Sequence, residues 1–462
     1  MSLQRRTVLG AGLATAAATL TGCREAVRSA TAGASAGPAA SASASAAPSR
    51  SAQARVATPD GTGPTSETLR DGAQATGRLR FTLTRHLAPT SANPKHPAYA
   101  GAVALCQVAG ATVAKAVVGK AVRHGAGPVL LPGPEQVWMR YDSIFDLASI
   151  TKVYTAILAL QQVDKGRIEL SARVVDHLPG FTGAGKEKVT VAMLLAHTSG
   201  LPVGARVTGL PDDAARRKAV LATPLVSGAV PGTVYRYSSV GLMVLAFLVE
   251  KLTGQRFDQA LKTGLTGPLG LRDTGFNPKT WLSTADQAAR LVATDARSAR
   301  GLLRGVVHDD VANHMGGIAG HAGIFSTAAE VAAIGQLLLG GGIHNGTRIL
   351  SEETTRQMLT NVNTGLPAID PERPHRTSAH GLGVVLDQPW FMGKLSGPRT
   401  FGHTGFTGTS LVVDPDRRMV LVLLTNRAHP NWSWANPDPV RVDVANVAAT
   451  IPAGPSSRRM SG

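Results

Sequence analysis

The chain of 462 residues is long enough to bury a large core, and its 43% hydrophobic and 17% charged residues are typical of a globular protein. Its formal net charge of +17 suits an anionic partner, either nucleic acid or an acidic cell envelope. Because the Lys and Arg residues are scattered, without a basic helix or a basic-aromatic module, we favour the envelope and expect no nucleic-acid partner.

The first 23 residues are typical of an export signal. Arg5 and Arg6 form a twin-arginine pair ahead of a short apolar stretch, Val8 to Leu20, which is too short for an ordinary membrane span. The stretch ends in Leu20-Thr-Gly-Cys23, which resembles a bacterial lipobox whose cysteine is lipidated. We therefore expect an exported lipoprotein, anchored through Cys23 to the outer face of the cytoplasmic membrane. The alternative is a soluble secreted protein with a chance cysteine at this position.

The segment after the signal is dominated by Ala, Ser, Gly and Pro. It has too few large apolar residues to offset the entropy of the chain, so we interpret residues 24–75 as a flexible tether. A single folded domain is expected over residues 76–455, and a helix is indicated over residues 66–86, across that boundary. Cys106 lies among apolar neighbours, which indicates a buried strand thiol without an internal disulfide partner.

Strands are predicted at both ends of this domain and helices in its middle. Two runs on either side of the turn Ala109-Gly110 predict a hairpin over 101–108 and 112–122, and Asp414 to Arg417 forms a turn between two further strands within 410–425. Helices are predicted from Ser149 to a stop at Gly166, with Asp146 as a possible cap, and over 189–201, 240–252 and 327–339. This order predicts an α/β (α+β) fold, in which one antiparallel sheet built from both chain ends is flanked by helices and carries a mostly helical insertion.

Ser149-x-x-Lys152 stands at the start of the first predicted buried helix. If that helix begins near Ser149, the hydroxyl and the amine lie one turn apart on the same face. A serine becomes nucleophilic when an adjacent base takes its proton, and a lysine can be that base once burial or a neighbouring cation lowers its pKa. Alone, this tetrapeptide is common, and it usually marks a solvated helix start.

Two further motifs follow in chain order, Tyr237-Ser-Ser239 and His403-Thr-Gly405. Together, the three motifs resemble the active-site set of the serine β-lactamases and penicillin-binding proteins. The version with Tyr in the second motif is similar to class C β-lactamases, the related DD-carboxypeptidases and a broad set of esterases. The resemblance spans roughly residues 75 to 450 and implies a β-lactamase/transpeptidase-like fold and a serine hydrolase. No cofactor is expected.

The resemblance implies a role for each catalytic motif. Ser149 would attack a carbonyl carbon and form an acyl-enzyme. Lys152 and Tyr237 would share the role of general base, with Lys152 and a charged His403 supplying the positive field that a phenol needs before it can lose its proton.

The third motif would line the cleft as an edge strand. Thr404 would offer its hydroxyl to a substrate carboxylate, and Gly405 would let the backbone and the substrate approach closely. The N–H of Phe406 would pair with the N–H of Ser149 as the oxyanion hole.

Three residues depart from the pattern of an efficient β-lactamase. His403 replaces the usual lysine, so carboxylate binding is expected to weaken, and activity on carboxylate substrates to fall, as the histidine deprotonates. Ser239 stands where Asn is usual and shortens a contact to the substrate carbonyl. Phe406 replaces a small residue and is expected to narrow or reshape the acyl pocket.

A metal site is the competing interpretation of His308, Asp309, Asp310, His314 and His321. Their spacing matches no compact zinc signature, and the intervening glycines indicate a loop rather than one helical face. We therefore expect no metal, and we expect these residues to shape the rim of the cleft.

The leading hypothesis is an exported, monomeric DD-carboxypeptidase-like or penicillin-binding hydrolase of cell-wall peptides. An esterase or a weak class C-like β-lactamase is the alternative within the same class. A non-catalytic penicillin-binding sensor module is an alternative of a different class, because Ser239 and Phe406 depart from the motif pattern.

Overall fold

The computed structural model describes residues 63–297 and 299–453. The predicted export signal, Cys23 and the tether up to residue 62 lie outside the described residues. Helix α1, Ser66–Arg85, forms where a helix was indicated. Because Thr68, Gly72 and Ala75 of this helix are already buried, packing of the chain begins ahead of the boundary predicted at residue 76.

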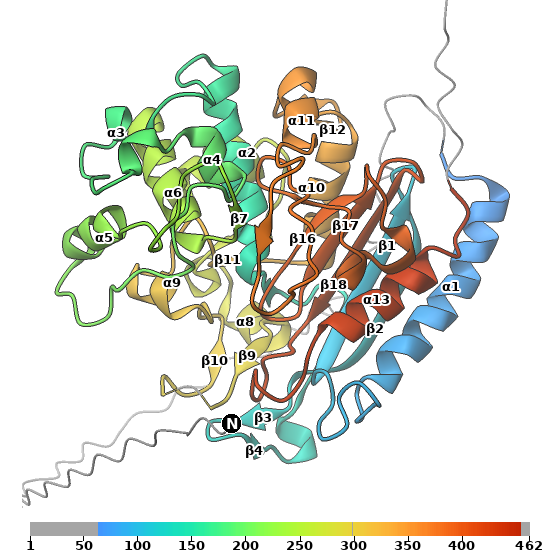
Figure 1. Ribbon diagram of the computed structural model, residues 1–462. Helices are drawn as coiled ribbons and strands as arrows, with labels where there is room; N and C mark the ends of the chain where they lie inside the picture. Colours follow the sequence, from blue (N-terminus) through green and yellow to red (C-terminus); the bar gives the residue numbers. More distant parts are fainter. Residues whose placement is uncertain (1–62, 298, 454–462) are drawn as a thin grey trace, which may run out of the picture. The chain divides into compact units, whose positions relative to one another are not determined.

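Within the described residues, the main sheet has seven antiparallel strands in the order β15-β16-β17-β18-β1-β2-β5 (Figure 1). The predicted hairpin and the sheet built from both chain ends are therefore confirmed. The strands of this sheet are β1 Gly101–Val108, β2 Ala111–Val122, β5 Val137–Trp138, β15 Val385–Leu386, β16 Phe401–Thr404, β17 Ser410–Asp414 and β18 Met419–Thr425.

Both faces of this sheet are covered by helices. Successive side chains of a strand point to opposite faces, so Val103 and Leu105 of β1 join one core cluster while Ala104 and Cys106 join the other. Helices α1 and α13, Asp438–Ala448, pack on one face, and α10, Ala328–Leu339, packs on the other (Figure 1). Burial raises the pKa of Cys106 to about 12, which confirms an unreactive strand thiol.

The segment between the two halves of the sheet is mostly helical, as predicted. Its helices are α10, described above, and α2 Thr151–Asp164, α3 Val174–His177, α4 Val191–Leu195, α5 Asp213–Ala222, α6 Ser239–Thr253, α7 Phe257–Leu261, α8 Thr284–Arg290, α9 Asp310–His314 and α11 Glu352–Met358. Helix α12, Pro389–Met392, follows between β15 and β16. Its short strands include β6 Phe145–Asp146, β7 Tyr235–Arg236, β8 Gly275–Phe276, β9 Ala293–Asp295, β10 Leu303–Arg304, β11 Ile324–Ser326 and β14 Ala368–Ile369.

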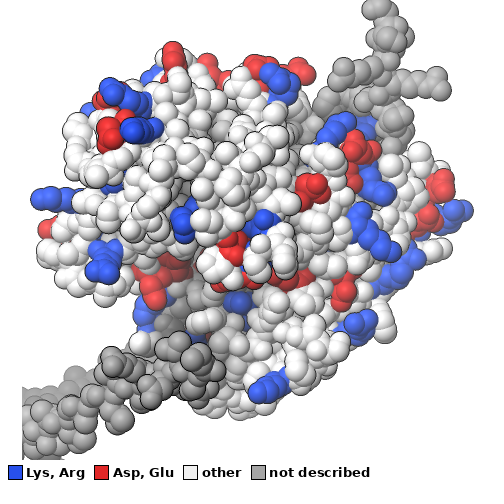
Figure 2. Space-filling model, in the orientation of Figure 1, with Lys and Arg blue, Asp and Glu red and all other residues white. Residues whose placement is uncertain are grey.

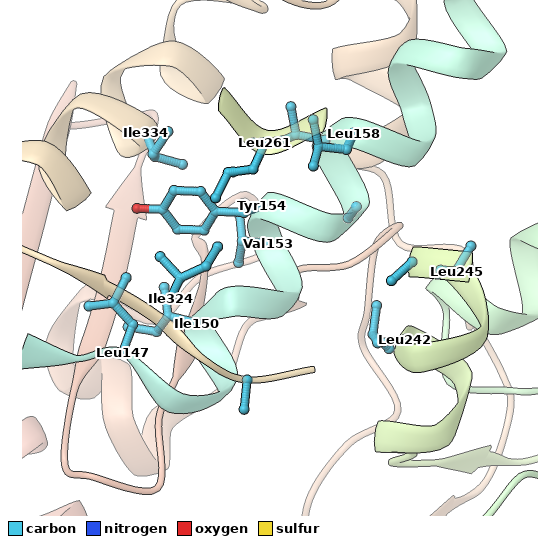
Figure 3. Packing of buried hydrophobic residues seen from close by; sticks show 14 of the residues in the cluster. Leu147, Ile150, Val153, Tyr154, Leu158, Leu242, Leu245, Leu261, Ile324 and Ile334 are labelled. Carbon is cyan, nitrogen blue, oxygen red and sulfur yellow. The ribbon is translucent and has the colours of Figure 1, made fainter. Parts of the chain in front are cut away.

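Helix α2 is the centre of the larger core cluster. Every residue from Thr151 to Gln162 is buried, and α2 packs against α6, itself buried from Ser239 to Val249. Figure 3 shows the ring of Tyr154 among Leu261, Ile324 and Ile334, which come from three different segments. A helix surrounded in this way is fixed in position, so it can hold reactive groups at its first turn with little freedom to move.

The surface carries both signs of charge. On the face shown in Figure 2, Lys and Arg side chains are interspersed with Asp and Glu rather than gathered in one patch. Across residues 63–297 and 299–453, no helix is long and apolar enough to cross a membrane.

Candidate active site

A strained turn presents Ser149 at the start of α2. Residues Ala148–Ile150 form one 3-10 turn, so α2 begins at Thr151 rather than at Ser149 as expected. Ala148 has a φ of +47°, a left-handed conformation that is costly for a residue with a Cβ. The buried carboxylate of Asp146 holds the turn, because its Oδ1 accepts from the Ala148 N–H at 2.8 Å and its Oδ2 from the His308 N–H at 2.7 Å.

The hydroxyl of Ser149 is hydrogen-bonded to two residues that the motifs predicted, Lys152 and Tyr237. Lys152 Nζ lies 2.9 Å from Ser149 Oγ, and the Tyr237 hydroxyl donates to the same oxygen at 2.9 Å. The lysine amine also lies over the tyrosine ring, 5.0 Å from its centroid. Residues 88 positions apart in the chain therefore meet at one hydroxyl. A nucleophile within hydrogen-bond reach of a base is the geometry that acyl transfer requires.

Burial makes Lys152 a usable base near neutral pH. The side chain is 1% exposed, and desolvation lowers its pKa to about 7, while the charge of Asp309 acts in the opposite direction. At and above that pH a substantial fraction of the amine is free of its proton and can accept one from Ser149.

The glycine-rich loop that contains Gly320 and His321 holds Lys152 and its helix through backbone carbonyl groups. Lys152 Nζ donates to the carbonyl of His321 at 3.0 Å, and Thr155 Oγ1, one turn later on α2, donates to the carbonyl of Gly320 at 2.6 Å. A Cβ on Gly320 would lie 2.1 Å from the carbonyl oxygen of Leu242 on α6. The loop thus passes between α2 and α6 only because this residue is a glycine.

Tyr237 is positioned by the connection between β7 and α6. Ser238 caps α6, since its Oγ accepts from the Gly241 N–H at 3.0 Å, and its own N–H donates to His197 Nδ1 at 3.1 Å. The ring of His197 packs against that of Tyr237 with centroids 4.7 Å apart. Desolvation raises the pKa of Tyr237 to about 12, so the phenol keeps its proton at neutral pH. In the resting site Tyr237 is therefore a protonated phenol, and its share in the general-base role stays a prediction.

The third motif lies beside the serine turn. Strand β15 pairs only with Phe401 and Gly402, so His403 and Thr404 form an open edge of β16, and β16 contacts the 3-10 turn. A Cβ on Gly405 would lie 2.4 Å from the carbonyl oxygen of Leu147, so glycine is required here by a contact inside the protein. In the described residues, the N–H groups of Ser149 and Phe406 have no hydrogen-bond partner, which leaves both available to an oxyanion.

Comparison with known proteins decides the family. Residues 90–446 match the family model described as Beta-lactamase. The chain belongs to this family. An Escherichia coli (strain K12) protein described as "Putative D-alanyl-D-alanine carboxypeptidase" is 31% identical over 336 residues, which cover 66% of this chain and 73% of that protein.

Two solved structures show the same fold. EstCE1, "a hydrolase with promiscuous acyltransferase activity", has a TM-score of 0.60 at 19% identity and covers 83% of this chain and 100% of its own. A penicillin-binding protein homologue from Caulobacter crescentus has a TM-score of 0.58 at 20% identity and covers 81% and 97%. The predicted β-lactamase/transpeptidase-like fold is confirmed, and as a member of this family the protein is a serine hydrolase.

His403 differs from its predicted state. Its side chain is buried, and desolvation, followed by the charge of Lys152, holds its pKa well below the ordinary 6.5. Its Nδ1 lies 2.8 Å from the carbonyl of Thr404, which can only accept, so Nδ1 carries the proton of a neutral ring. His403 therefore does not supply the positive field that we considered beside Tyr237. This strand of the β-lactamase-family site supplies hydroxyl and backbone groups but no cation.

Two polar side chains of the motifs remain available to a substrate. Ser239 begins α6 and is 8% exposed, and Thr404 is partly exposed at the end of β16. Within residues 63–297 and 299–453, neither hydroxyl has a protein hydrogen-bond partner. Both can bind a substrate without giving up a bond inside the protein.

The histidines and aspartates of residues 308–321 form ion pairs. His308 pairs with Asp295 at 3.2 Å, and His321 pairs with Asp309 at 2.9 Å. In the part of the chain that the structure describes, no group of three such side chains could hold a metal ion. His321 is buried behind Lys152 rather than at the rim where we expected it.

Sequence reasoning missed the support of the catalytic pair. It assigned no role to Thr155, to His197 or to the backbone carbonyl of His321. The helix predicted over 189–201 contains His197, and the glycines near His321 indicated a loop there. These patterns were the available signal, and none of them pointed to Thr155.

Proposed function

We propose that the protein is an exported serine hydrolase that forms an acyl-enzyme on Ser149 and removes the terminal residue of cell-wall peptides, as a DD-carboxypeptidase does. The observation that carries this proposal is the hydroxyl of Ser149, held at 2.9 Å by both Lys152 Nζ and the Tyr237 hydroxyl. Similarity to the Escherichia coli protein described as "Putative D-alanyl-D-alanine carboxypeptidase" supports the choice of substrate.

The proposed acylation begins with Lys152. Its neutral amine takes the proton of Ser149 as Oγ attacks the carbonyl carbon of the scissile bond. The carbonyl oxygen becomes an oxyanion, which the N–H groups of Ser149 and Phe406 stabilise. When the scissile bond breaks, the leaving amine receives the proton from Lys152, directly or through the Tyr237 hydroxyl.

Deacylation repeats these steps with water in place of serine. The amine of Lys152, neutral again, and the phenol of Tyr237 lie beside the ester oxygen of the acyl-enzyme, because both are hydrogen-bonded to Ser149 Oγ in the resting site. Water attacks the ester carbonyl and gives up a proton to Lys152, and Ser149 recovers its proton as the acid leaves. No metal or cofactor takes part in the proposed cycle.

An esterase is the second candidate, and the state of His403 favours it. A peptide ending in a free carboxylate is best held by a cation, but His403 is neutral and buried. Thr404 and Ser239 then offer only neutral hydroxyls to that carboxylate. An ester without a terminal carboxylate has no such requirement.

The location of the enzyme is part of the proposal. The twin-arginine pair and the lipobox ending at Cys23 support export and a lipid anchor on the outer face of the cytoplasmic membrane. We propose that the anchored protein acts as a monomer on peptides of the cell wall.

The experiment compares a peptide with an ester. Purified protein is incubated with a peptide ending in D-Ala-D-Ala and with a short-chain ester, and the release of D-alanine or alcohol is measured for wild type and Ser149→Ala. Release of D-alanine by wild type alone supports the carboxypeptidase, and ester turnover without D-alanine release supports the esterase. Equal rates in wild type and Ser149→Ala would exclude both.

A further inference from the structure

Two exposed aromatic side chains lie together next to an N–H of the candidate oxyanion hole. Phe406 is 46% exposed and Trp432 is 39% exposed, and their ring centroids are 5.6 Å apart. The ring of His308 lies 5.2 Å from that of Phe406 on another side. Exposed aromatic rings that gather beside a nucleophile offer a broad apolar face to a ligand.

This aromatic shelf, formed by Phe406, Trp432 and His308, is held in place by two arginines. The guanidinium of Arg427 lies over the Phe406 ring at 4.6 Å, and that of Arg297 over the Trp432 ring at 4.7 Å. Arg427 also donates to the carbonyl of Phe406 and to that of Ala435, each at 3.2 Å. Rings fixed before binding lose little entropy when a ligand stacks on them.

The shelf starts at the turn that carries Ser149. The N–H of His308 donates to Asp146, whose other oxygen holds the Ala148 N–H. Gly405, which precedes Phe406, approaches Leu147 so closely that no Cβ fits between them. A carbonyl oxygen bound at the Phe406 N–H therefore brings one of its two substituents against the Phe406 ring.

The chemistry decides which substituent that is. The leaving group must face the proton donors, Lys152 and Tyr237, because it takes a proton as it departs. Among residues 63–297 and 299–453, no hydrogen bond or ring contact joins the shelf to either of these two residues. The side of the carbonyl that faces the shelf is thus the acyl side.

We propose that the aromatic shelf is the subsite for the acyl group, and that it selects acyl groups with an aromatic or broad apolar face. This inference rests on the proposed acyl-enzyme at Ser149. Of the two candidate functions it favours the esterase, because the residue that carries the scissile carbonyl in a D-Ala-D-Ala peptide has only a methyl side chain. It explains the departure at Phe406, since a small residue at this position would leave Trp432 without its ring partner.

The test compares two esters that differ only in the acyl group. The value of kcat/KM is measured for 4-nitrophenyl acetate and 4-nitrophenyl phenylacetate with wild type, Trp432→Ala and Phe406→Leu. We expect the ratio of phenylacetate to acetate to fall about fivefold in each variant, because a stacked pair of rings is worth roughly that factor. The ratio is independent of how much of a variant is folded.

Two controls make the result specific. Trp138→Ala removes another exposed tryptophan with a cation over its ring, but at the far edge of the sheet on β5, and is expected to leave the ratio unchanged. The second control keeps the acetyl group and changes the leaving group, by using 2,2,2-trifluoroethyl acetate. Trp432→Ala is expected to change kcat/KM for this ester by the same factor as for 4-nitrophenyl acetate.

Two results would overturn the shelf. One is a ratio unchanged in both Trp432→Ala and Phe406→Leu, and the other is an effect confined to the leaving-group comparison. Failure of the proposed function looks different, because Ser149→Ala would then hydrolyse both esters as fast as wild type.

Discussion

Replacing Lys152 with methionine removes a buried amine while keeping most of its volume. Desolvation lowers the pKa of Lys152 from its ordinary 10.5 to about 7, so the folded protein binds this proton less tightly than the unfolded chain does. Stability is therefore reduced in full below pH 7, and the reduction fades as the pH rises from 7 toward 10.5. Above that range the amine is neutral in both states and the reduction is gone.

The magnitude follows from the two pKa values. A difference of one pKa unit corresponds to about 1.4 kcal/mol, so the reduction below pH 7 is ~5 kcal/mol. Methionine has no amine to desolvate, so the variant does not have this loss of stability. It does lose the hydrogen bonds of Nζ to Ser149 Oγ and to the His321 carbonyl, which costs about 1–3 kcal/mol. We expect Lys152→Met to be more stable than wild type by about 2–4 kcal/mol at pH 6, with the difference shrinking by ~3 kcal/mol at pH 9.

Urea unfolding followed by tryptophan fluorescence at pH 6, 7, 8 and 9 measures this difference. Effects of titrating groups that do not interact with Lys152 cancel between wild type and Lys152→Met. Lys188→Met, at an exposed lysine, serves as the matched control without a pH-dependent difference. A difference between Lys152→Met and wild type that is the same at all four pH values would refute the reasoning, because Lys152 would then titrate alike in the folded and unfolded protein.

Three further predictions concern the catalytic pair. Tyr237→Phe removes the phenol 2.9 Å from Ser149 Oγ and should lower kcat by about 10²-fold with little change in thermal stability, so a kcat near that of wild type would argue against its role in proton transfer. Asp309→Asn removes a charge that raises the pKa of Lys152, so the rising limb of kcat/KM against pH should move to lower pH; movement to higher pH would contradict the assignment of that limb to Lys152. Gly320→Ala forces a Cβ against the Leu242 carbonyl and should lower both the melting temperature and kcat, whereas Gly316→Ala, which strains a left-handed backbone but places its Cβ in open space, should reduce kcat far less.

Periodicity and motif order predicted the parts of this structure that depend on local sequence. The hairpin of β1 and β2, the apolar helix α6 with Gly254 at its end, and the turn from Asp414 to Arg417 all form where the sequence indicated them. The order of the three motifs predicted that Ser149, Lys152 and Tyr237 would meet, although no local pattern links residues so far apart.

The remaining features depend on tertiary contacts that a linear pattern does not contain. The left-handed Ala148 delays the start of α2, and it is held there by Asp146, which also receives an N–H from residue 308. The pKa of His403 lies well below its ordinary value because the fold buries the ring beside Lys152, and no local pattern around residue 403 shows that burial. Lys152 donates to the backbone carbonyl of His321, and a backbone group is the same whatever the residue type, so this contact cannot be predicted from the sequence at position 321.

The central claim is that Ser149 carries the acyl group, and trapping the intermediate tests it most directly. The protein is incubated with benzylpenicillin at pH 8, where Lys152 is largely neutral, and its intact mass and peptide map are measured alongside Ser149→Ala. The account predicts one added penicilloyl mass, located on the peptide that contains Ser149 and absent from the variant. An adduct of the same mass in Ser149→Ala, or one mapped to another residue of wild type, would contradict it.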